Sequence, residues 1–327
     1  MDREPEELQF LGFFGICKEA TNIITTLRRL FTQLTFSLIL PLILPLSLIF
    51  LIHTQISNLI FSKINKNKTA LETAPDGSPT QDRLFSHLSS EWTAFLLFKL
   101  AYLICLLILS LLSTSAVIYT VACTYTSKDT TFKKVMSVVP KVWKRLMVTF
   151  LWNSIVVFAY NSATFFILIL VLVLFINGPY TAGQTILIIV GVLYLIGLVH
   201  ITVIWRLAGV ISVLEDSYGL HALKKSKQLI KGKTPVAALV FFLLIVSYFG
   251  VLVLFEGGGV VGKAAAVALL SVVLLMGLVV ETVIYFVCKS YHHESIGKFA
   301  LADHLEVYLG EYVPLTLKDV QLEQLHV

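Results

Sequence analysis

The sequence predicts an all-α, polytopic membrane protein with six transmembrane helices and with amphipathic interfacial helices on the cytoplasmic side. Three observations predict this fold class. Of the 327 residues, 57% are hydrophobic and only 14% are charged, whereas about a quarter of the residues of a soluble domain are charged. The mean hydropathy is +0.86. Six apolar stretches are each long enough to cross the hydrocarbon layer, which takes about 20 residues.

The predicted membrane domain, residues 34–288, contains these six spans, at 34–53, 94–122, 147–176, 185–206, 235–255 and 264–288. A cytoplasmic segment, 1–33, precedes this domain, and a cytoplasmic tail, 289–327, follows it. The longest run without charge is interrupted by Asn177-Gly178-Pro179-Tyr180. Such a sequence predicts a tight turn between two antiparallel helices.

Lysine and arginine residues determine the predicted orientation, because cytoplasmic loops collect them. Of the 25, 19 fall in the N-terminal segment, in 123–146, in 206–234 and in the tail, while Lys99 lies inside a span. Both termini are therefore expected on the cytoplasmic side. The membrane itself is expected to be the plasma membrane or one of the secretory pathway. The first loop on the opposite side, 54–93, is polar and expected to be mostly disordered. It carries a candidate glycosylation site at Asn67.

A basic amphipathic segment precedes each pair of spans, at 10–31, 132–146 and 218–233. Apolar residues in these segments recur at intervals of three and four, as on one face of a helix. Pro140 is expected to bend or restart the second helix, and Pro235 suits the first turn of the helix after the third. Helices of this kind lie in the headgroup layer and bind anionic lipid. The expected lipid-facing basic residues are Arg28, Arg29, Lys144, Arg145, Lys224, Lys225, Lys231 and Lys233. The alternative is that all three are ordinary basic loops.

A conspicuous motif lies in and after the fourth span. It comprises Val210-Ile211-Ser212-Val213-Leu214-Glu215, Tyr218-Gly219, Ala222, Lys225-Ser226, Leu229 and Gly232-Lys233. In this motif and in the tail at 308–314 the chain resembles a plant family of multi-pass transmembrane proteins of unknown function. It is also weakly similar to bacterial integral-membrane families of unknown function. The resemblance implies an architecture and supplies no catalytic residues.

Two charged residues fall at similar predicted depth in the cytoplasmic half of the membrane. Glu281 lies seven residues before the end of the last span, and Arg206 lies equally deep if its helix continues to Leu214. An ionisable residue inside a membrane is a functional candidate, and pairing lowers the cost of burying its charge. His200, Asn153 and Asn161 are candidates for the same polar cluster. The pair is expected either to fix helix packing or to line a transport pathway.

The cysteines have no spacing of a metal or redox site. Cys123 and Cys288 lie at predicted cytoplasmic helix ends, and Cys17 lies in the first predicted interfacial helix, so each is either a palmitoylation candidate or a buried thiol. The glycine-rich segment from Gly257 to Lys263 has the spacing of a phosphate-binding loop. Ala264 follows where that loop needs Ser or Thr, so a turn is expected there and no nucleotide.

No Ser-His-Asp set, zinc-protease motif or paired acidic motif occurs in the sequence. We therefore expect a non-enzymatic membrane protein of the endomembrane system, without cofactors and without nucleic acid. Its expected partners are membrane lipids, including anionic lipid at the cytoplasmic face. The expected role is to organise membrane or trafficking machinery through that face. The alternative is a transporter or channel that uses Arg206 and Glu281.

Overall fold

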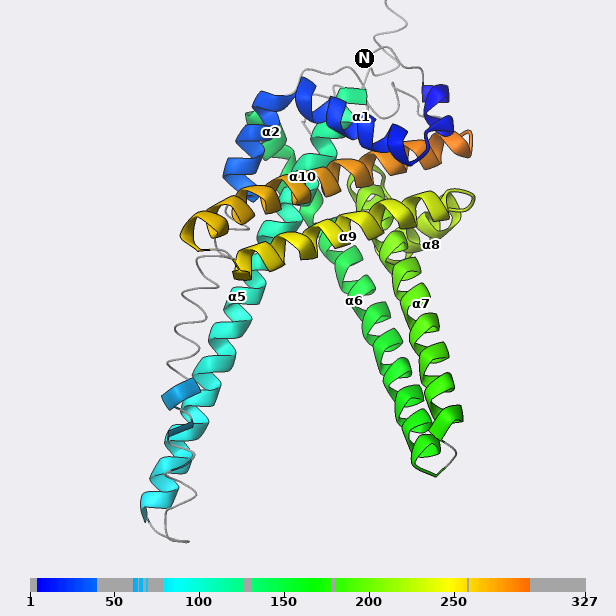
Figure 1. Ribbon diagram of the computed structural model, residues 1–327. Helices are drawn as coiled ribbons and strands as arrows, with labels where there is room; N and C mark the ends of the chain where they lie inside the picture. The colour runs from blue at the N-terminus through cyan, green and yellow to red at the C-terminus, as the bar shows by residue number, and fades with distance from the viewer. Residues whose placement is uncertain are drawn as a thin grey trace, which may run out of the picture. The chain divides into compact units, whose positions relative to one another are not determined.

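The computed structural model describes residues 5–39, 79–125, 131–177, 180–257 and 259–294, with six further positions between 61 and 69. Every regular element in these ranges is helical (Figure 1). In chain order the elements are η1 (Pro5–Phe10), α1 (Phe13–Thr26), α2 (Arg28–Leu34), the π-helical turn η2 (Thr35–Ile39), α5 (Pro79–Tyr125), α6 (Phe132–Asn177), α7 (Tyr180–Leu214), α8 (Leu220–Leu229), α9 (Thr234–Gly257) and α10 (Val260–Tyr291).

Five of these helices are long and apolar enough to cross a membrane. The qualifying stretches are Phe85–Tyr125, Phe132–Val173, Gln184–Leu214, Thr234–Phe255 and Val261–Tyr291. They contain the second, fourth, fifth and sixth predicted spans and all but the last three residues of the third, which is what an integral membrane protein requires. The first predicted span, 34–53, lies outside the described residues beyond Ile39, so a total of six stays a prediction.

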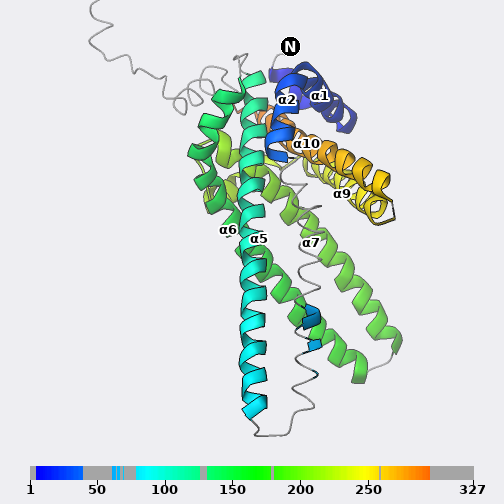
Figure 2. The same ribbon diagram turned by 90° about the vertical axis from the view of Figure 1, so that its left-hand side faces the viewer.

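The second basic segment, 132–146, is not a separate helix, contrary to the prediction. It forms the first part of α6, which has 46 residues and is therefore about 69 Å long at 1.5 Å per residue. Pro140 lies inside α6 without ending it, and Figure 2 shows a bend in the first part of this helix. Extending an existing helix needs no new nucleation, so the apolar span can support the basic turns before it.

The predicted disorder of the loop 54–93 is wrong for its last part, because α5 already begins at Pro79. Aromatic residues support this extension: the Trp92 ring lies edge-on to Phe61 at 6.5 Å and to Phe95 at 5.9 Å. Lys63 Nζ also lies 3.3 Å from Glu91 Oε1. The polar composition of residues 79–93 did not indicate a helix, although this part of α5 is continuous with the apolar span. Asn67 lies outside the described residues.

The helix boundaries around the third basic segment follow the prediction more closely. α8 is a separate helix within 218–233, and Pro235 is the second residue of α9. α7 continues past Arg206, the predicted end of the fourth span, to Leu214, which is the continuation on which the predicted depth of Arg206 depends. The turn residues also fall where expected, since α6 ends at Asn177 and α7 begins at Tyr180.

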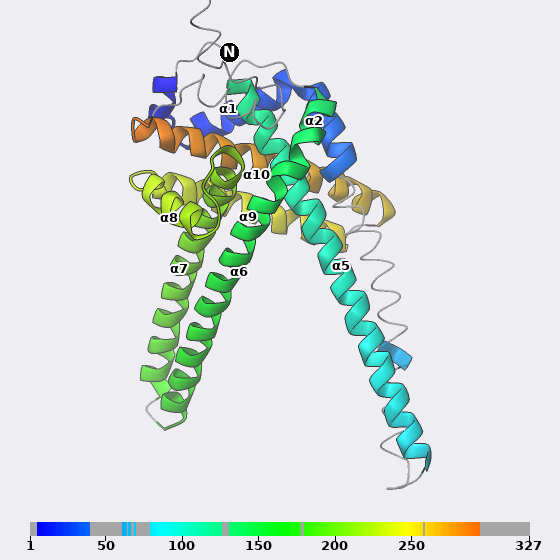
Figure 3. The same cartoon turned by 180° about the vertical axis from the view of Figure 1, so that it is seen from behind.

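The chain forms two compact units. One comprises Met1–Phe31, Thr114–Ser247 and Met276–Val327, and the other comprises Thr32–Ser113 and Tyr248–Leu275. In the first unit, the core gathers where α5, α7 and α10 end. Its large, fully buried side chains include Ile118, Leu207, Ile211, Tyr285 and Phe286. In the same unit α6 and α7 pack along each other as a hairpin, with α8 beside the end of α7 (Figure 3).

The N-terminal helices do not form the single helix predicted over 10–31, because the chain breaks at Leu27 between α1 and α2. α1 buries Ile16, Ala20 and Ile23 in the protein, whereas Phe14 on another side is 84% exposed. The apolar residues therefore cover more of the helix surface than the protein core requires. That α1 lies along a membrane surface stays a prediction.

Candidate functional site

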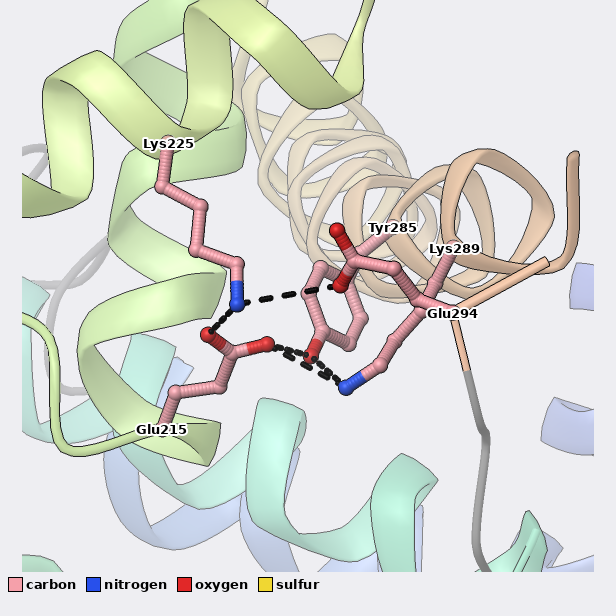
Figure 4. A network of polar contacts seen from close by, with 5 residues as sticks. All are labelled: Glu215, Lys225, Tyr285, Lys289 and Glu294. Atoms are coloured by element: carbon pink, nitrogen blue, oxygen red, sulfur yellow. Dashed lines mark hydrogen bonds and ion pairs between the residues drawn. The ribbon is translucent and has the colours of Figure 1, made fainter. Parts of the chain in front are cut away.

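Five charged or hydroxyl-bearing side chains meet where α7 ends, and we call this set the Glu215 network (Figure 4). Glu215 directly follows α7, and its side chain is 14% exposed. Lys225 of α8 places its Nζ 2.7 Å from Glu215 Oε2. From α10, Tyr285 donates its hydroxyl to Glu215 Oε1 at 2.6 Å, and Lys289 Nζ donates to the same oxygen at 3.2 Å. Glu294 completes the network with an oxygen 3.7 Å from Lys225 Nζ.

The network therefore joins three segments through one carboxylate. Tyr285 and Lys289 are four residues apart on α10, so they project from the same face of that helix. Charge-assisted hydrogen bonds such as these are stronger than neutral ones. Glu215 thus connects the end of α7 to both α8 and α10.

Neighbouring groups keep Glu215 ionised. Burial by itself raises the pKa of this carboxyl, but the hydrogen bonds from Lys225 and Tyr285 and the charges of both lysines lower the pKa overall. At Lys225 burial lowers the pKa, but the hydrogen bond and the charge of Glu215, with a contribution from Glu294, raise the pKa overall. Both groups are therefore charged near neutral pH.

The turn from α7 into α8 requires glycine at position 219. Gly219 has φ +63° and ψ −133°, a conformation that other residues rarely adopt. A Cβ there would lie 3.1 Å from Cδ1 of Trp152. The Gly219 N–H donates to Thr149 Oγ1 at 2.8 Å, and Ser212 Oγ lies 2.6 Å from the same atom. The turn is thus held against α6 and α7 by buried polar groups.

The inner face of α8 is fixed to α7. Ser226 is fully buried and donates its hydroxyl to the carbonyl of Ile204 at 2.7 Å. Ala222 and Leu229 are buried on the same side. After α8, Gly232 adopts φ +87° with the Tyr291 ring so close that a Cβ would lie 2.6 Å from it. Ala222, Ser226, Leu229 and Gly232 all belong to the sequence motif; burial favours the first and third, a hydrogen bond favours Ser226, and steric contact with Tyr291 favours Gly232.

A polar depression of about 460 Å³ lies between α8 and the chain that follows α10. Lys224, exposed on α8, and His221 form no ion pair or hydrogen bond with the residues that the structure describes. His292 Nε2 lies 3.1 Å from the carbonyl oxygen of Lys231, which holds the ring in place. The depression is lined by Ser217, His221, Lys224, Lys225, Gln228, Leu229, His292 and Glu294.

The structure brings Arg206 and Glu281 together in an ion pair between α7 and α10, as the sequence predicted. The Glu281 side chain is 4% exposed, whereas that of Arg206 is 40% exposed. Arg206 also stacks beside Trp205, with its guanidinium carbon 5.7 Å from the ring centroid. The pair connects the same two helices as the Glu215 network, one turn of α10 before Tyr285. Its depth in a bilayer stays a prediction.

The other three candidates for that polar cluster lie elsewhere. His200 is exposed on α7 and Asn153 is buried on α6, and neither makes a hydrogen bond to the pair within the described ranges. Asn161 accepts a hydrogen bond from the Tyr194 hydroxyl at 2.9 Å. The rings of Tyr160 and Tyr194 are stacked with centroids 5.6 Å apart. These residues pair α6 with α7 and do not extend the charged site.

A family model described as "Domain of unknown function (DUF8558)" matches residues 1–325. The chain belongs to this family. No curated protein and no solved structure matches the chain. The family's description names no activity, so its function has to be argued from the residues above. The resemblance to a plant family stays a prediction.

The basic residues expected to face lipid divide by exposure. Arg145, Lys225 and Lys233 are partly buried, and Arg145 forms an ion pair with Asp216 at 2.7 Å. Lys233 lies over the Tyr291 ring, 5.2 Å from its centroid. The exposed members are Arg28, Arg29, Lys144, Lys224 and Lys231. The exposed residues are positioned to reach a ligand or a membrane, whereas Lys225 chiefly fixes α8.

The thiols favour the alternative of plain buried cysteines at two of three positions. Cys123 and Cys288 are 1% and 0% exposed, and a buried thiol is a poor target for modification. Cys17 is partly exposed on α1, and burial raises the pKa of its thiol. A thiol with a raised pKa forms less of the reactive thiolate at neutral pH.

Sequence reasoning missed the centre of the site. Glu215 and Lys225 were noticed as parts of a motif, but their mutual contact was not predicted, and Tyr285 and Lys289 were not singled out. A signal was present, because Tyr285 and Lys289 are one turn apart on a helix end and could face an acidic residue. Only the packing of α7 against α10 shows which acidic residue that is.

Proposed function

We propose that this protein is a non-enzymatic, multi-pass membrane protein of the secretory or endomembrane system. Its basic cytoplasmic face organises membrane or trafficking machinery by binding anionic lipid or acidic partners. The observation that carries this proposal is the way α8 is mounted. Its inner face is fixed through Ser226 and Lys225, while Lys224, Lys227 and Lys231 remain exposed.

Such an arrangement suits recognition better than a loose loop does, because the backbone that carries the lysines is already ordered when a partner binds. Each basic residue close to an anionic membrane surface contributes about 1 kcal/mol. α8 also ends five residues before α9 begins, so its lysines lie near the start of a candidate span. The headgroup layer is the surface within reach of such a position.

The test is to reconstitute the full chain in nanodiscs that mix phosphatidylcholine with phosphatidylserine and to measure the lipids retained by mass spectrometry. Phosphatidylserine should be enriched around the protein, and enrichment should fall as salt rises. The double variant Lys227→Gln, Lys231→Gln should lower it. The matched control Lys263→Gln, on the predicted opposite face, should not. Equal effects of both variants, or no enrichment in the wild type, would refute the proposal.

A second candidate function, transport, is favoured by one observation, the Arg206–Glu281 ion pair inside the candidate spans. The same ion pair could instead be structural, because a buried Glu281 bonded to Arg206 would fix α7 against α10. The variant Glu281→Gln separates the two. If the pair is structural, the variant should unfold more easily and any flux per folded molecule should stay unchanged. Altered flux through vesicles with unchanged stability would favour transport.

A further inference from the structure

The depression between α8 and the end of α10 is lined largely by groups that donate hydrogen bonds or carry positive charge. From α8 come His221, Lys224 and Gln228, and His292 faces them from the turn after α10. Lys224 and His221 have no polar partner among the residues that the structure describes. Exposed donors with no intramolecular partner are available to a ligand.

The charges of the lining favour an anion. Lys224 and Lys225 are positive and Glu294 is negative, so the lining carries one net positive charge when both histidines are neutral. Glu294 does not oppose an anion with its full charge, because its carboxylate lies 3.7 Å from Lys225 Nζ. Lys225 is in turn held by Glu215. The charge left uncompensated is therefore that of Lys224.

The depression is also preorganised. Ser226 fixes α8 to α7 on the face opposite the exposed lysines, and His292 is oriented by its contact with the Lys231 carbonyl oxygen. A volume of about 460 Å³ falls within the range of about 300–1,000 Å³ that is common for small-molecule sites. A planar carboxylate would use few of the donors on α8, whereas a phosphate offers them several acceptor oxygens.

We propose that this depression binds a phosphate monoester, presented either by a phosphorylated lipid headgroup or by a soluble phosphate compound. The inference rests on the proposed function, because it names the ligand class recognised on the basic face. Lys224 provides the main charge, His221 and Gln228 provide hydrogen bonds, His292 lines the side of the depression toward the end of α10, and Glu294 sets an upper limit on affinity.

The test uses the full chain in nanodiscs of phosphatidylcholine alone, with isothermal titration calorimetry. The probes are dioctanoyl phosphatidylinositol 4-phosphate, dioctanoyl phosphatidylinositol without the monoester, and inorganic phosphate. The monoester lipid should bind once per chain and more tightly than the lipid without the monoester. Lys224→Gln should weaken this binding about tenfold, the loss of one charge-assisted contact. Glu294→Gln should strengthen it about threefold, because one repulsion is removed.

Lys133→Gln is the matched control, since Lys133 is an exposed lysine on α6 outside the depression. It should change affinity by less than about twofold, a weak surface effect. Thermal unfolding of each variant checks that α8 remains folded. Inorganic phosphate that competes with the lipid at similar affinity assigns the site to soluble phosphates. If the monoester lipid binds and inorganic phosphate does not displace it, the site is assigned to a lipid headgroup.

Equal weakening by Lys224→Gln and Lys133→Gln would overturn the site and leave a diffuse attraction, so the proposed function would survive. The same holds if the two inositol lipids bind equally. Absence of monoester binding together with absence of phosphatidylserine enrichment would overturn both proposals.

Discussion

The Glu215 network and the outer part of the α6–α7 hairpin belong to one compact unit but are stabilised differently. The outer hairpin, residues 151–173 and 184–200, presents large apolar side chains on its surface, among them Leu151, Phe158, Phe166, Leu170, Ile188, Leu193 and Ile196. Its polar contacts across the two helices centre on Tyr194. In the network, one carboxylate collects three hydrogen-bonding partners from two other segments.

This difference shows where residue identity is constrained. On the outer hairpin, lipid can solvate any apolar side chain of similar size, so composition suffices. Around Glu215, a changed side chain leaves a donor or an acceptor without its partner, and that costs more than the bond itself contributes. The same substitution should therefore have different effects in the two regions.

The largest expected difference concerns glycine. Gly219→Ala should lower the free energy of unfolding by about 3 kcal/mol, because alanine is strained at this backbone conformation and its Cβ would approach Trp152. Gly191→Ala on the outer hairpin meets open space, and alanine favours helix by about 1 kcal/mol over glycine. Unfolding by denaturant in mixed micelles measures both. Equal stability of the two variants would show that the turn does not constrain the fold.

Carboxylates should give the second difference, about 2 kcal/mol. Glu215→Gln removes the charge that pairs with Lys225 and Lys289 in a partly buried site. The adjacent Asp216 is 74% exposed in its ion pair with Arg145, so Asp216→Asn should change stability by less than about 0.5 kcal/mol. The pair of variants is compared by thermal unfolding in detergent. A larger effect at Asp216 would contradict the assignment of Glu215 as the centre.

Serine hydroxyls should show a smaller contrast. Ser226→Ala removes a buried hydrogen bond between helices and should destabilise by about 1 kcal/mol. Ser154→Ala on α6 removes a hydroxyl that bonds only within its own helix, to the carbonyl of Phe150. It should be neutral within about 0.5 kcal/mol. The unfolding midpoints of the two variants measure this contrast. Similar losses of stability would mean that Ser226 does not fix α8.

The smallest effect is a change in pH dependence. Because the folded pKa of Glu215 is lowered, its stabilisation is full above its unfolded value and is lost as pH falls through the folded pKa. Because the pKa of Lys225 is raised, its stabilisation is full below its unfolded value and is lost as pH rises through the folded pKa. The wild type should thus lose stability at both extremes. Glu215→Gln should flatten both ends of the profile, and an unchanged profile would exclude this coupling.

Much of the fold could be predicted from hydropathy and charge alone. Five spans were found because an apolar run of about 20 residues has few alternatives to a membrane helix. The contact of Arg206 with Glu281 was predicted for a similar reason, since few partners exist for a charge within an otherwise apolar stretch. The turns at Asn177 and around Gly257 followed from local chain chemistry.

The rest depends on information that local patterns do not carry. Polar residues do not reveal that α5 begins at Pro79, because the apolar part of the same helix supplies the nucleus. The 132–146 segment has the pattern of a separate helix, but Pro140 is accommodated within α6. The Glu215 network joins residues 70 positions apart, and only tertiary packing brings such residues together.

This separation along the chain also affects how the protein is made. The ribosome adds about 5–20 residues per second, so Tyr285, 70 positions after Glu215, follows it on the order of ten seconds later. During that interval Glu215 has Lys225 available, ten residues on, but neither of its α10 partners. The polar site at the end of α7 is consequently incomplete until α10 has been synthesised. A ribosome stalled before Tyr285 would expose an unfinished polar site to the quality-control machinery of the membrane.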